Sequence, residues 1–268
     1  MILTELFENG TLFALTGALA GLLSGLLGIG GGIVIVPALA FLFKHNANVP
    51  STMIMHFAAG TSLLIMIITS QSAIRTHYRL GEILWPVFHK LWPGIVVGTL
   101  LGALVADLIP SQWLRVFFGL FLLFVAYRMF SSRHQMNTFH SPKPWINNVI
   151  SLLIGFKSGM LGIGGGVLII PYLTWCGVDV RKIAPVTGLC TLTIAVVGSM
   201  AFMITGYNDV GISAYSIGYV YWPAALWIAI PSAMFAQLGA RLTYKVPVQQ
   251  LKYGFIVFLL ITAVDMLV

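Results

Sequence analysis

The sequence predicts an all-α polytopic membrane protein built from two homologous four-segment halves. The first observation is composition: 59% of the 268 residues are apolar, only 8% are charged, and the mean hydropathy is +0.96. Soluble globular proteins carry about 25% charged residues. The second observation is a series of apolar runs of helical length, which indicates helices and not the short alternating strands of an outer-membrane barrel. The third is an internal duplication.

The duplication is clearest in a nineteen-residue stretch near the N-terminus. GLLSGLLGIGGGIVIVPAL, residues 21–39, returns 134 positions later as GFKSGMLGIGGGVLIIPYL, residues 155–173, with 12 of 19 positions identical. Weaker correspondence continues through the rest of both halves. We therefore divide the chain into a first membrane repeat, a polar cytoplasmic linker and a second membrane repeat, at 1–130, 131–144 and 145–268.

Eight apolar stretches follow one another, and two are too long for one crossing. Residues 11–43 and 145–176 span 33 and 32 residues, or about 50 Å as helices, against a hydrocarbon core of about 30 Å. Each must break or fold back, and a cluster of four glycines within five residues marks the predicted point. We call residues 28–32 the first break and residues 162–166 the second break. The other six stretches are 53–72, 85–106, 113–130, 183–205, 219–240 and 250–268.

The basic residues discriminate between two topologies for the long stretches. If each crosses once, the 13 lysines and arginines of loops and helix ends divide seven against six. If each enters and returns, eleven lie on one side, and only Lys44 and Arg115 lie on the other. The second distribution is what the positive-inside rule expects. We therefore expect an inverted repeat with both termini outside, each half opening with a discontinuous or re-entrant segment.

The glycine breaks have a physical use at membrane depth. Glycine lets the backbone unwind where irregular structure survives only if it is buried in protein or faces water. The half-helix after each break presents free N–H groups and the positive end of its dipole. Two such ends meeting near the midplane form a site for a small anion. The alternative is that the glycines only permit close helix packing.

The doubled glycine signature resembles the TauE/SafE family of permeases over most of the chain. The pattern S-G-x-L-G-I-G-G-G followed by a proline stands at residues 24–37 and again at 158–171. An A-x-x-T-S element at 58–62 and a G-Y-V run at 218–220 are also similar to the family. The resemblance implies that sulfur-containing anions, such as sulfite, sulfonates and related organosulfur compounds, move across the cytoplasmic (inner) membrane. It settles neither direction nor coupling ion.

Polar side chains beside the breaks are candidate ligands for the anion. Ser24 and Ser158 offer hydroxyl donors, although buried serines often bond to a backbone carbonyl instead. Lys157, inside an apolar stretch, attracts the anion or else extends to the membrane boundary. Gln237 offers an amide donor, with helix–helix hydrogen bonding as its alternative role.

The helix after each break supplies further hydroxyls. Thr61 and Ser62 follow the first break, whereas the second copy reads Thr187-Gly188, so that one donor is missing there. Thr191 offers a replacement hydroxyl on the same helix. The full set of candidate substrate-binding residues is Ser24, Gly28, Gly30, Gly31, Gly32, Thr61, Ser62, Lys157, Ser158, Gly162, Gly164, Gly165, Gly166, Thr187, Thr191 and Gln237.

These features favour a secondary transporter for small sulfur-containing anions that works by alternating access. The alternative is an anion channel, or a permease for another small anion. The sequence has no motif of an intramembrane enzyme, no metal-ligand cluster and no sign of a cofactor. The net charge of +7 lies mainly in short loops, as membrane orientation requires, so nucleic acid is not an expected partner. The expected partners are the anionic substrate and the lipid bilayer; no oligomeric state is predicted.

Overall fold

A computed structural model of the chain describes residues 2–27, 31–44, 49–80, 84–131, 143–178, 180–208, 215–242 and 248–268. The first half contains α1 (Ile2–Leu27), α2 (Gly32–Lys44), the 3-10 turn η1 (Ser51–Met53), α3 (Ile54–Leu80), α4 (Trp85–Leu108) and α5 (Ser111–Ser131). The second half contains α6 (Pro144–Leu161), α7 (Gly166–Trp175), α8 (Val180–Thr205), the 3-10 turn η2 (Gly206–Asn208), β1 (Ser216–Ile217), β2 (Val220–Tyr221), α9 (Trp222–Leu242) and α10 (Val248–Leu267).

The predicted all-α membrane class agrees with this architecture. Within the described ranges, four helical stretches are long and apolar enough to cross a bilayer: Ser51–Ser72, Trp85–Leu108, Ser111–Ser131 and Lys182–Thr205. Such lengths match the roughly 20 residues that a hydrocarbon core requires. The sequence did not predict the two-residue strands β1 and β2, which form a small antiparallel hairpin before α9.

Both long apolar stretches are broken at the glycines and fold back. The ring of Phe13 in α1 lies 6.5 Å from that of Phe43 at the far end of α2, so α2 returns alongside α1. In the second half, Tyr172 of α7 donates a hydrogen bond to Asn147 near the start of α6. The predicted second break is confirmed between α6 and α7. In the first half the interruption lies between α1 and α2, but Gly28 and Gly30 are outside the described residues.

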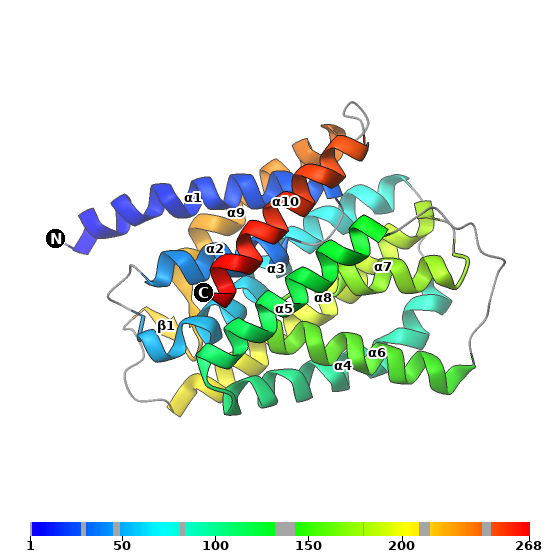
Figure 1. Ribbon diagram of the computed structural model, residues 1–268, viewed down its shortest axis with the longest axis horizontal. Helices are drawn as coiled ribbons and strands as arrows, with labels where there is room; N and C mark the ends of the chain where they lie inside the picture. Colours follow the sequence, from blue (N-terminus) through cyan, green and yellow to red (C-terminus); the bar gives the residue numbers. More distant parts are fainter. Residues whose placement is uncertain are drawn as a thin grey trace.

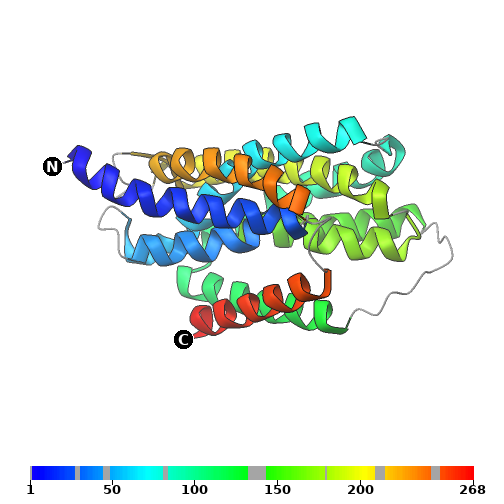
Figure 2. The same cartoon turned by 90° about the horizontal axis from the view of Figure 1, so that it is seen from above.

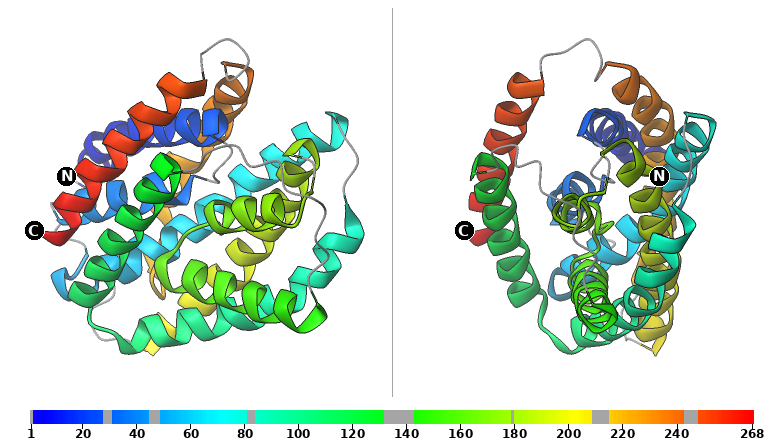
Figure 3. Two further views of the ribbon diagram at one scale, coloured as in Figure 1. Left: turned by 45° about the vertical axis from the view of Figure 1, so that its right-hand side comes forward. Right: turned by 90° about the vertical axis from the view of Figure 1, so that its right-hand side faces the viewer.

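The helices of the two halves are interleaved (Figure 1). α1 packs along α9, and the equivalent pair from the opposite halves, α6 and α4, packs in the same way. If each helix is replaced by its equivalent in the other half, the pair of α1 and α9 becomes the pair of α6 and α4. Two of the three remaining equivalent pairs also pack together, α3 against α8 and α5 against α10. Figures 2 and 3 show α5 and α10 side by side as an outer layer.

Small residues allow the paired helices to approach closely. A β-carbon at Gly98 of α4 would lie 2.1 Å from the carbonyl oxygen of Leu152 in α6. One at Gly21 of α1 would lie 2.3 Å from that of Ser232 in α9. Such backbone approach is typical of membrane helices, which lack a hydrophobic driving force for association. These glycines allow close packing between helices and are not part of the two breaks.

Helices α3 and α8 run antiparallel through the centre of the bundle. A β-carbon at Gly198 of α8 would contact Leu63 of α3. Ten residues earlier in α8, a β-carbon at Gly188 would contact Ile74, which lies eleven residues later than Leu63 in α3. Both helices contribute buried polar residues. The site described next lies against these two helices.

Candidate functional site

The second break is built on two left-handed glycines. Gly162 ends α6 with φ +71°, and Gly165 precedes α7 with φ +67°, a conformation that only glycine adopts without strain. The Gly165 carbonyl accepts the first helical bonds of α7, from the N–H groups of Leu168 and Ile169, each at 2.9 Å. The N–H groups of Gly166 and Val167 precede this ladder and have no intrahelical acceptor.

The first break has the same geometry where it is described. Gly31 has φ +75°, and its carbonyl accepts from Val34 and Ile35 at 2.9 and 3.0 Å. A β-carbon at Gly31 would lie 3.4 Å from Ser24 Oγ, and one at Gly165 would lie 3.2 Å from Ser158 Oγ. Both copies therefore place a serine hydroxyl beside the glycine that opens the half-helix.

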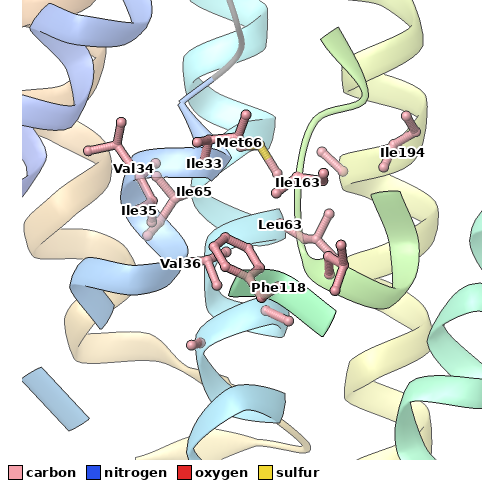
Figure 4. Packing of buried hydrophobic residues seen from close by; sticks show 14 of the residues in the cluster. Ile33, Val34, Ile35, Val36, Leu63, Ile65, Met66, Phe118, Ile163 and Ile194 are labelled. Carbon is pink, nitrogen blue, oxygen red and sulfur yellow. The ribbon is translucent and has the colours of Figure 1, made fainter. Parts of the chain in front are cut away.

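The two breaks meet in the middle of the protein. A β-carbon at Gly32 would lie 2.9 Å from Cα of Ile163 and 3.1 Å from the carbonyl oxygen of Gly162. Figure 4 shows Ile33 and Ile163 facing one another, with the side chain of Met66 between them. Gly32 of the first break therefore lies against the second break.

Three of the four candidate hydroxyls on α3 and α8 bond to the protein backbone. Ser62 donates to the Gly162 carbonyl at 3.0 Å, and Thr191 donates to the Gly164 carbonyl. Thr61 accepts from the N–H of Tyr221 in β2 at 3.0 Å. Ser62 and Thr191 thus hold the second break from two helices, whereas Thr61 holds the hairpin.

Two other candidate hydroxyls are buried without a hydrogen-bond partner in the described part of the chain. They are Ser158 Oγ at the second break and Thr187 Oγ1 on α8. An unsatisfied buried hydroxyl costs free energy unless something else completes its bonding. Ser158 is fully buried in the last turn of α6, and its Oγ lies beside Gly165, which precedes α7. The first N–H groups of α7 lack intrahelical acceptors, so both kinds of donor are available to one ligand.

Lys157 and Gln237 are not brought to the breaks. Lys157 lies on the exposed face of α6, although its neighbour Ser158 is buried. Gln237 is also exposed, and its amide donates to Ser72 Oγ at 3.1 Å, which is the helix–helix role given above as its alternative. Because the stretch around residue 157 is apolar on all sides, its sequence does not distinguish an inward from an outward lysine.

No motif in the sequence singles out Met66. Its Sδ would lie 3.0 Å from a β-carbon at Gly32 and 3.2 Å from one at Gly164, so it touches both breaks. A methionine within an apolar helix looks like an ordinary core residue, which is why only the structure identifies it.

Comparison with known proteins agrees with the doubled signature. The family described as sulfite exporter TauE/SafE matches residues 13–266. This chain belongs to the TauE/SafE family. A probable membrane transporter protein of Haemophilus influenzae is 35% identical over 94% of this chain and 96% of its own length. Another, from Methanocaldococcus jannaschii, is 32% identical over 90% of this chain and 89% of its own length. No solved structure matches the chain.

Membership of the TauE/SafE family identifies the chain as a membrane transporter. A third relative, the probable membrane transporter protein YunE of Bacillus subtilis, is 28% identical over 85% of this chain and 86% of its own length. All three names describe transport, and none gives a substrate. The family and these names agree with the prediction of a transporter.

Proposed function

We propose that the protein is a secondary transporter that binds a small sulfur-containing anion between its two glycine breaks. The observation that carries the proposal is the contact of Gly32 with Gly162 and Ile163, which brings the start of α2 against the second break. Helix N-termini favour negative charge. The fully buried Ser158 hydroxyl adds a donor without a described protein partner. The family description, sulfite exporter, supports sulfite or a related organosulfur anion.

The pairing of equivalent helices supports alternating access. Since α3 and α8 are equivalent and run antiparallel, the halves fit an inverted repeat about an axis perpendicular to the helices. An anion bound where the two breaks touch is then reached from one side of the membrane or the other, because one break rearranges at a time. Because α1 pairs with α9 and α6 with α4, each moving body combines helices of both halves.

The orientation proposed is in the cytoplasmic (inner) membrane with both termini outside. Figure 1 shows the ends of α3 and α5 and the starts of α4, α6 and α8 at the same end of the bundle. These helix ends carry basic residues, namely Arg75, Arg128, Lys90, Lys143 and Lys182. The opposite end, where α2 stops and α5 begins, carries Lys44 and Arg115. This asymmetry supports a cytoplasmic location for the first end.

Uptake into liposomes tests the proposal. Purified protein is reconstituted, and uptake of radiolabelled sulfite, thiosulfate, taurine and sulfoacetate is measured with and without unlabelled competitor. We expect saturable uptake of at least one anion, blocked by its competitor. Linear uptake without saturation would indicate a channel instead, and no uptake by folded protein would refute the substrate class.

The same assay tests the site through Ser158→Ala. A hydrogen bond to a charged partner contributes about 1.5–3 kcal/mol, so the half-saturation concentration should rise about tenfold or more. Ser232→Ala is the matched control, because Ser232 Oγ is also fully buried without a described partner but lies between α9 and α1. Equal effects of the two substitutions would contradict the placement of the site.

A further inference from the structure

The space between the two breaks contains the thioether of Met66. This residue belongs to α3 in the first half and is fully buried. Its Sδ would lie within 3.0 Å of a β-carbon at Gly32 and within 3.2 Å of one at Gly164. Contacts this short mean that the sulfur lies against the backbone of both signatures, as Figure 4 also shows.

The position is not duplicated. Counting from the equivalent residues Thr61 and Thr187, the counterpart of Met66 is Leu192, which is only partly buried. A single side chain from one half therefore lies between Gly32 of the first break and Gly164 of the second. Any anion that contacts both of these glycines has to enter the volume that this side chain fills.

Methionine is suited to leaving and re-entering such a volume. Its unbranched chain has three rotatable bonds, so the sulfur can change position without a backbone movement. The thioether is a weak acceptor and carries no donor, so it does not satisfy the N–H groups at the helix starts in the way an anion does. Ser62 and Thr191 hold the second break in place meanwhile.

We infer that Met66 is the occluding and size-selecting residue of the substrate site. This inference rests on the proposed function. The Met66 side chain swings aside when a small anion binds between Gly32 and Gly164, and the volume it can vacate limits the anions that are accepted. Sulfite-sized anions need only this displacement. Bulky aryl sulfonates need more room than the side chain releases.

The test is a comparison of a small and a large anion in liposomes. Saturable uptake of sulfite and of benzenesulfonate is measured for the wild type and for Met66→Ala. The ratio of benzenesulfonate uptake to sulfite uptake is then compared between the two proteins. We expect the ratio to rise at least tenfold in Met66→Ala. Met66→Leu keeps a similar volume but is branched and less flexible, so we expect an unchanged ratio with slower uptake.

Met55→Ala is the matched control for general loss of packing. Met55 lies on the same helix and is similarly buried, at 3% exposure, but its N–H bonds to Ser111 at the end of the bundle. An equal change of ratio in Met66→Ala and Met55→Ala, or no change in Met66→Ala, overturns the inference alone. Absence of saturable uptake of every anion by the wild type overturns the proposed function and this inference with it.

A second measurement covers the case in which Met66→Ala does not fold. In a variant with Cys176 and Cys190 replaced by alanine, Met66→Cys is treated with a small anionic methanethiosulfonate. Methanesulfonate is the protecting anion, because sulfite itself reacts with the labelling reagent. We expect excess methanesulfonate to slow labelling of Met66→Cys at least fivefold, whereas Met55→Cys is not protected. Labelling of Met66→Cys that methanesulfonate leaves unchanged overturns the inference.

Discussion

The second break is held by two hydroxyls that lie outside it, whereas the corresponding positions around the first break carry no hydroxyl. Ser62 of α3 donates to the Gly162 carbonyl, and Thr191 of α8 donates to the Gly164 carbonyl. Their counterparts, counted from Thr61 and Thr187, are Gly188 and Ile65. The glycine signatures are nearly identical, but the residues that surround them have diverged.

This difference teaches that the duplicated motif fixes a backbone shape and not a complete site. Gly31 and Gly165 have the same left-handed conformation, each with a serine hydroxyl beside it. What differs is how firmly each break is tied to its neighbours. We expect the second break to be the fixed side of the site and the first break to be the side that rearranges.

The largest effect expected from this comparison is that of Gly162→Ala set against Gly31→Ala. Both introduce a side chain at positive φ, which costs about 1–2 kcal/mol. At Gly162 the new β-carbon would also lie 2.4 Å from Cα of Ala59, whereas at Gly31 the nearest atom is a side-chain carbon of Ile35 at 3.3 Å. Gly162→Ala should abolish the monodisperse peak in size exclusion, and Gly31→Ala should lower the melting temperature only moderately. Similar behaviour of both variants would contradict a firmer second break.

A smaller effect separates Thr61 from Thr187. Thr61→Val leaves the buried N–H of Tyr221 without its acceptor, a loss of about 1–3 kcal/mol. Thr187→Val removes a hydroxyl without a described partner and should leave the free energy of unfolding almost unchanged or slightly higher. Thermal unfolding in detergent measures both. Destabilisation by Thr187→Val equal to that by Thr61→Val would show that Thr187 already has a structural partner.

The smallest effect concerns Ser62 and its counterpart Gly188. Ser62→Ala removes one hydrogen bond to the second break, worth about 1 kcal/mol. Gly188→Ala should be nearly neutral, because alanine favours the helix by about 1 kcal/mol and the 3.0 Å contact is with a side-chain carbon of Ile74. The melting temperatures of the two variants check this difference. A larger decrease in melting temperature for Gly188→Ala than for Ser62→Ala would contradict it.

Local features of the fold were predictable from the sequence, whereas packing between helices was not. The glycine cluster locates the break between α6 and α7 because backbone freedom depends on the residues themselves. The hairpin of β1 and β2 escaped prediction because it is short and is held by distant partners: Tyr219 bonds to Asp107 of α4, and Tyr221 bonds to Thr61. A two-residue strand has no periodicity of its own.

The same division applies to the candidate site. The meeting of Gly32 with Gly162 was expected because the duplicated motif implies equivalent half-helices. The exposure of Lys157 and the central place of Met66 were not, because an apolar membrane helix gives little indication of which face turns inward. Side chains whose role depends on that face require the structure.

The interleaving of the halves has a consequence for the order in which the protein is made. α1 leaves the ribosome well before α9, yet the surface that Gly21 opens on α1 is covered by α9, about two hundred residues later. α4 waits for α6 in the same manner, over a shorter interval. Contacts between segments so distant in sequence form late. The close-packing surface of α4 therefore faces lipid until α6 is made, and that of α1 faces lipid until α9 is made.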